Sequence, residues 1–211
     1  MKTRIIGGLL ILVAGIALYV LYTRKSCKVL RTIDTHDGTI EIVDAECLEG
    51  LPHTTTMNTI RMTDSVWNSD RRETILVHER VHLDQKRRPR EWGEFYRSAW
   101  NYELLTSPPS GFPSAEIRPN PDTTGKPWAL WRGRYLFYPQ YGPERTLRNA
   151  PVLIWDTQKQ QHVDIPPEWR SEFCHGETCP HQYEHPHEIA AEYVTQSSTS
   201  PSAVKLFRWL K

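Results

Sequence analysis

Two histidines four residues apart, His78 and His82, lie in an apolar segment with the sequence ILVHERVH, residues 75–82. Positions four apart on an α-helix differ by about 40° around its axis, so both imidazoles project from one face. The apolar flanks predict a buried helix, and burying two histidines and Glu79 without polar partners costs free energy. The pattern therefore indicates either a metal site or two histidines on an ordinary helix, which also arises by chance in a chain with nine histidines.

The metal that this pattern favours is Zn²⁺, because imidazole nitrogens suit it and two helical histidines leave room for a third ligand and a water molecule. Glu79 follows the first histidine directly, at the edge of the same face, where it can reach that water without binding the metal. Zinc lowers the pKa of bound water to about 7. Glu79 is then expected to act as general base while the water attacks a carbonyl carbon.

A third ligand is predicted in the segment PHEIAAE, residues 186–192. Pro186 is well placed to start a helix, because the N–H that it lacks would have no partner there. Glu188 would supply a carboxylate, and the small Ala191 one turn later permits close approach of the helix with the histidines. Glu192 is expected to orient a ligand histidine through its second ring nitrogen. Taken alone, the segment is more typical of an amphipathic helix with two exposed acids.

These two segments resemble the gluzincin metallopeptidases. HERVHLDQ (residues 78–85) matches HExxHxxQ, and PHEIAA matches the PxExxA helix of small bacterial and phage proteins of this type. The chain is also similar to membrane-associated zinc proteases that carry HExxH and then ExxAD, with Glu192 in place of the final Asp. The resemblance covers about residues 70–105 and 185–195 and is interrupted by a long Pro- and Trp-rich stretch. It implies a zinc site with the ligands His78, His82 and Glu188 and the base Glu79.

The cysteines allow several interpretations. The chain has four, Cys27, Cys47, Cys174 and Cys179, and an even count fits disulfides in an oxidising compartment. For Cys174 and Cys179 three alternatives stay open: a disulfide, a structural metal site shared with nearby histidines, and free thiols.

The N-terminus is a separate matter. Residues 5–22 contain no charged side chain and, as a helix, would span about 27 Å, close to the roughly 30 Å of a bilayer core. A cleaved signal peptide is the alternative, but Tyr19, Tyr22 and Arg24 stand where a small-residue cleavage site would be needed. The expectation is a single-span anchor over residues 1–25. The side of the membrane stays open, because the basic residues after the span favour the cytoplasm and the cysteines favour the opposite side.

Hydrophobic periodicity and turn signals predict the remaining elements. Around Asp37-Gly38, residues 29–43 read as a hairpin, and residues 58–63 as a short strand. Asp70 is expected to cap a helix that ends near Arg88. The other predicted elements are a second helix at 90–105 with an aromatic core face, short strands within 128–138 and 151–165, and a last helix at 186–196.

The predicted fold class is α+β: a transmembrane helix, then one zincin-like domain (26–211) with a small β component and a long insertion at 106–181. The predicted function is zinc-dependent hydrolysis of a peptide or protein substrate. The alternative is a membrane-anchored structural or assembly subunit of a larger complex that keeps the scaffold without turnover. A net charge of +1 gives no reason to expect a nucleic acid as partner.

Overall fold

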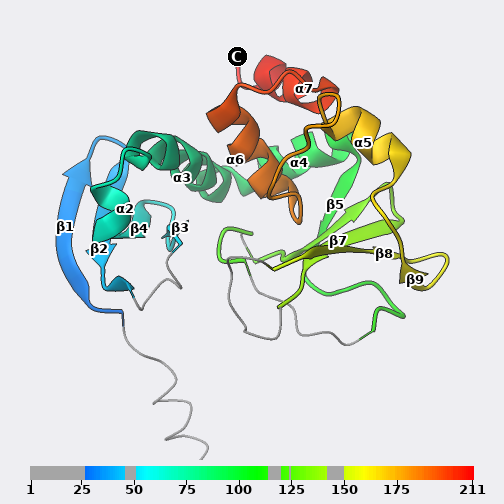
Figure 1. Ribbon diagram of the computed structural model, residues 1–211, viewed down its shortest axis with the longest axis horizontal. Helices are drawn as coiled ribbons and strands as arrows, with labels where there is room; N and C mark the ends of the chain where they lie inside the picture. Colours follow the sequence, from blue (N-terminus) through cyan, green and yellow to red (C-terminus); the bar gives the residue numbers. More distant parts are fainter. Residues whose placement is uncertain (1–26, 46–50, 114–119, 124, 142–149) are drawn as a thin grey trace, which may run out of the picture.

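The computed structural model describes residues 27–45, 51–113, 120–123, 125–141 and 150–211. Two β-sheets lie on opposite sides of a group of helices, with the N-terminal sheet beside α3 and the second sheet beneath α4, α5 and α6 (Figure 1). The chain between the two sheets forms α2, α3 and α4, and the remaining helices follow the second sheet in the sequence.

The first sheet has four strands in the order β1-β2-β4-β3, and its bounds are β1 Val29–Thr35, β2 Gly38–Val43, β3 His53–Thr54 and β4 Thr59–Thr63. The predicted hairpin is confirmed, since β1 and β2 are antiparallel and Thr35 pairs with Gly38. Gly38 has φ of 141°, and a Cβ there would lie 2.3 Å from the carbonyl oxygen of Asn58. Only glycine fits this crossing, because any other side chain would collide with backbone.

The helix that carries the histidine pair is α3 (Arg72–Arg87). It does not begin as predicted, because Arg71 and not Asp70 is its N-cap and no side chain caps it. The chain first forms a short helix, α2 (Asp64–Trp67), whose N-cap Thr63 accepts a hydrogen bond from the Val66 N–H. The apolar face of α3 covers the first sheet, and the core there is built from Ile40, Ile42, Ile60, Met62, Leu76 and Leu83.

The next helix, α4 (Pro89–Trp100), ends earlier than predicted. Asn101 adopts a left-handed conformation with φ of 58° and terminates it, and the chain continues as a strand, β5 (Tyr102–Leu105). The predicted aromatic core face is confirmed, and its buried members are Trp92, Phe95, Tyr96 and Trp100.

The second sheet is formed by β5 with β6 (Trp128–Trp131), β7 (Tyr135–Pro139), β8 (Val152–Asp156) and β9 (Gln161–His162), in sequence order and antiparallel throughout. The predicted regions 128–138 and 151–165 both contain strands. The first holds β6 and β7, which are joined by a tight turn, and the second holds β8 and β9. The predicted small β component is wrong: the described residues form two sheets with nine strands.

Three further helices cover the second half: α5 (Pro167–Phe173), α6 (Pro186–Gln196) and α7 (Pro201–Trp209). Only α6 was expected, and it starts at Pro186 as predicted. α7 is capped by Ser200, whose side chain accepts a hydrogen bond from the Ala203 N–H.

The structure corrects the membrane-anchored fold class and the single-pass membrane localisation. Among the described residues no helix is long and apolar enough to cross a membrane. The longest of them, α3, has 16 residues and carries charged side chains along its length. The predicted anchor at 1–25 lies outside the described residues, as does Cys47.

Of the three alternatives for Cys174 and Cys179, the structure contains the disulfide. Cys174 follows α5, and the four residues between the cysteines form a turn in which His175 and Thr178 exchange two backbone hydrogen bonds. These sulfur atoms therefore cannot serve as metal ligands.

Candidate metal centre

The site lies where α3 packs against α6 (Figure 1). His78 and His82 project from α3, and Glu188 from the first turn of α6. The His78 Nε2 atom lies 3.1 Å from His82 Nε2 and 3.1 Å from Glu188 Oε2, and His82 Nε2 lies 3.3 Å from the same oxygen. The three atoms form a nearly equilateral triangle, and these residues could bind a metal ion.

The triangle has the size that a tetrahedral metal requires. Ligand bonds of about 2.0–2.1 Å place neighbouring ligand atoms about 3.3–3.4 Å apart. Within the described part of the chain the group has three members, which matches a catalytic site with an open fourth position better than a closed structural site. His82 and Glu188 are buried, whereas the His78 side chain is 18% exposed, so His78 is the member of the group that solvent reaches.

The electrostatics of the group favour a cation. Burial lowers the pKa of the His82 imidazole, but the negative charges of Glu188 and Asp122 outweigh burial and raise this pKa to about 10. Burial raises the pKa of the Glu188 carboxyl, but the charge of His82 and hydrogen bonds from both histidines hold it well below its ordinary value. A positive charge at the triangle is therefore strongly stabilised, and a proton on His82 provides it when no ion is bound.

Glu79 follows His78 on α3 and is buried, close enough to the triangle for the charges of His82 and Glu188 to act on its carboxyl. Its Oε2 atom has no hydrogen-bond partner among the described residues. Burial and the negative charge of Asp122 raise the pKa of this carboxyl well above its ordinary value. An unpaired buried carboxylate oxygen is costly. A cation at the triangle and a water molecule beside it would offset this cost, so the residues present fit a metal.

Gln85, the last residue of the HExxHxxQ pattern, is a partner of His82, a role that the sequence reasoning did not assign to it. Its side chain is fully buried, and its amide nitrogen donates to the Tyr96 hydroxyl at 3.0 Å and to the His187 carbonyl at 3.1 Å. Its oxygen must therefore face the Nδ1 atom of His82, 2.7 Å away, which makes Nδ1 the donor. When His82 is neutral, this contact holds its proton on Nδ1 and leaves the Nε2 lone pair directed at the triangle. The sequence signal for this role was the position of Gln85, three residues after His82 and one turn further along the helix.

Replacing Gln85 by leucine should raise the dissociation constant for zinc by about 10–100-fold, because partners behind a ligand histidine contribute by that factor. A competition titration against a chromophoric chelator measures it. Gln85→Glu keeps the acceptor for Nδ1 and should bind zinc more tightly than Gln85→Leu. Equal affinities of the two variants would show that the contact with Nδ1 has no role.

Glu192, predicted to orient a ligand histidine, is used differently in the structure. Its carboxylate accepts hydrogen bonds from the backbone N–H groups of His181 and Gln182 at 2.9–3.0 Å and from the Gln196 amide at 2.9 Å. It therefore stabilises the loop that leads into α6.

The histidines near Glu188 are engaged elsewhere. The Nδ1 atom of His187 lies 2.8 Å from the Asp122 carbonyl, and the Nε2 atom of His185 lies 3.1 Å from the Lys126 carbonyl. Burial lowers the pKa of both imidazoles, that of His187 to about 4. His181 is exposed. Of Glu188 and these three histidines, the structure brings Glu188 to the histidine pair.

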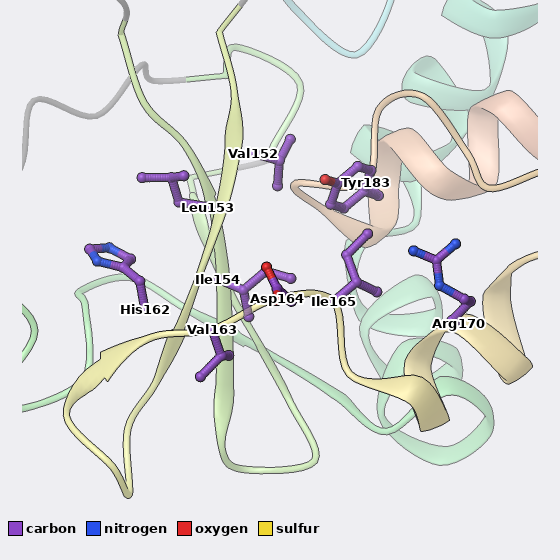
Figure 2. A pocket seen from close by; sticks show the side chains of 9 residues that line it. All are labelled: Val152, Leu153, Ile154, His162, Val163, Asp164, Ile165, Arg170 and Tyr183. Atoms are coloured by element: carbon purple, nitrogen blue, oxygen red, sulfur yellow. The ribbon is translucent and has the colours of Figure 1, made fainter.

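A separate hollow of about 550 Å³ lies at the β8–β9 edge of the second sheet. Figure 2 shows that its lining comes from these strands, the segment after β9, Arg170 of α5 and Tyr183. None of the three residues of the triangle lines it, so this hollow does not contain the metal centre.

Comparisons with known proteins identify no relative: no family model matches the chain, and no curated protein and no solved structure is significantly similar to it. The class of protein must therefore be inferred from the site.

Proposed function

We propose that the protein is a zinc-dependent hydrolase of peptide bonds, with His78, His82 and Glu188 as zinc ligands and Glu79 as the general base. One observation carries the proposal: the triangle of ligand atoms with 3.1–3.3 Å sides lies beside a buried carboxylate that has an unpaired oxygen. Two imidazoles and one carboxylate are a donor set that zinc binds in hydrolytic enzymes.

The proposed chemistry divides between metal and protein. Zinc, when bound, lowers the pKa of water to about 7 and polarises a carbonyl oxygen. Glu79 accepts the proton of the attacking water and later donates it to the leaving amine. Burial suits Glu79 to both roles, because it raises the pKa of the carboxyl well above its ordinary value, so the group binds a proton more readily than a solvated glutamate does. The peptide bond as substrate is supported by the resemblance of HERVHLDQ and PHEIAA to the gluzincin pattern.

Metal analysis tests the proposal. Protein purified without a chelator should contain about one zinc ion per chain, as a single site with three protein ligands requires. His78→Ala should lose the ion, whereas His181→Ala, which changes an exposed histidine, should keep it. Zinc affinity should also rise with pH, because the ion competes with a proton on His82.

Folded protein without zinc would contradict the proposal. Zinc-loaded protein that cleaves no member of a broad peptide library would favour the alternative, a non-catalytic subunit that keeps the metal.

A further inference from the structure

A short segment of the Pro- and Trp-rich stretch, residues 120–123, contacts Glu188 of the metal centre and elements of both halves of the protein. The Asp122 carboxylate accepts hydrogen bonds from the Thr54 N–H at 3.0 Å, from the Thr54 hydroxyl and from Lys86 Nζ at 3.2 Å. The Asp122 carbonyl lies 2.8 Å from His187 Nδ1. The segment is thereby fixed to β3, α3 and α6 at once, and we call it the strap.

The contact with β3 uses the open edge of the first sheet. Thr55 donates its N–H to the Thr59 carbonyl in β4, so the N–H and carbonyl of the preceding Thr54 point away from β4. Asp122 accepts from that N–H, and Lys86 Nζ donates to that carbonyl at 2.6 Å. These paired contacts make the strap a fixed part of the site's surroundings.

Asn120 begins the strap, and the orientation of its amide is determined by its neighbours. Its Oδ1 atom accepts from the Asp122 N–H at 2.8 Å, so its nitrogen must face the other way. That nitrogen donates to Glu188 Oε1 at 2.7 Å and lies 3.4 Å from Glu184 Oε1.

The two oxygens of Glu188 therefore have different partners. Oε2 faces both histidines, at 3.1 and 3.3 Å, whereas Oε1 is held by Asn120. We infer that Asn120 is a positioning residue, which fixes the rotation of the Glu188 carboxylate so that one oxygen faces the metal position. The inference rests on the proposed zinc site and adds to it a residue that no sequence motif contains.

The test compares zinc binding by Asn120→Ala and by a matched control. Gln196→Ala removes a hydrogen bond of the same kind, from an amide to a carboxylate at 2.9 Å. Its acceptor, Glu192, lies on α6 like Glu188 but does not face the histidine pair. Without Asn120 the carboxylate can rotate. The dissociation constant for zinc should therefore rise by about 10–100-fold, and the visible absorption of the Co²⁺-substituted protein should change. Gln196→Ala should match wild type in both measurements.

Unchanged zinc affinity and an unchanged Co²⁺ spectrum in Asn120→Ala would overturn the inference. Equal weakening by both variants would do so as well, because it would reflect a general loss of structure. If Asn120→Ala does not fold, Asn120→Ser takes its place and is judged by the same two measurements, together with urea unfolding of the metal-free protein.

His78→Ala in the same titration separates this inference from the proposed function. Loss of zinc in His78→Ala with normal binding in Asn120→Ala would refute the positioning role alone. Normal binding in His78→Ala would refute the zinc site itself, and the role of Asn120 with it.

Discussion

Replacing Glu79 by glutamine should lower the rate of peptide hydrolysis by about 10²–10⁴-fold, the usual contribution of a general base, while the zinc content stays unchanged. Glutamine keeps the size of the side chain but cannot accept the proton of the attacking water. The metal should stay because Glu79 is not part of the triangle of ligand atoms. Initial rates on a fluorogenic peptide library, with zinc measured on the same samples, give both quantities.

The matched control is Glu73→Gln, which makes the same change on the same helix at a side chain that is 70% exposed. It should hydrolyse peptides at the wild-type rate. Equal rates in wild type and Glu79→Gln would assign the hydrolysis to another site or to a contaminant.

The second large effect concerns the carboxylate ligand. Glu188→Gln should weaken zinc binding more than His181→Ala, His185→Ala or His187→Ala does. The dissociation constant for zinc should rise by more than the factor of about 10–100 that is typical when a hydrogen-bond partner of a ligand is lost. The change removes the negative charge opposite both histidines and leaves an amide whose nitrogen cannot bind the metal. Competition titrations of the four variants give the order of affinities.

The three histidine variants are controls of different kinds. His185 and His187 are buried and bonded to backbone carbonyls, so their variants test whether disturbance of α6 alone releases zinc. His181 is exposed and tests the neighbouring loop. A histidine variant that loses zinc while Glu188→Gln keeps it would indicate a three-histidine site, and the resemblance of residues 186–192 to the gluzincins would then be coincidental.

Much of the candidate site could be predicted from the sequence because helix geometry is local. The spacing of His78 and His82 fixes their common face, and Pro186 marks the start of the helix that carries Glu188. A zinc site requires a third protein ligand, and the carboxylate on this second helix can supply it. Gln85 was accessible by the same argument, since it lies one turn beyond His82 and its side chain contacts that histidine.

The rest depends on contacts that no local rule contains. Asn120 reaches Glu188 across 68 positions of sequence, from the long Pro- and Trp-rich stretch, for which the sequence predicts only short strands. The second sheet was underestimated because its strands have at most five residues and because two of its connections, 106–127 and 140–151, are long. Asp70 carries the signature of a helix cap, but it lies in the turn that follows α2, and α3 begins after Arg71.

The separation of the ligands along the chain has a thermodynamic consequence. His78 and Glu188 are 110 positions apart, so a bound ion is a cross-link that closes most of the described chain into one loop. An ion that binds only the folded protein stabilises it by about 2.7 kcal/mol when its free concentration is a hundred times the dissociation constant. The ambient zinc concentration would then contribute to the resistance of this protein to unfolding and proteolysis, and metal starvation would remove one of the links between its two halves.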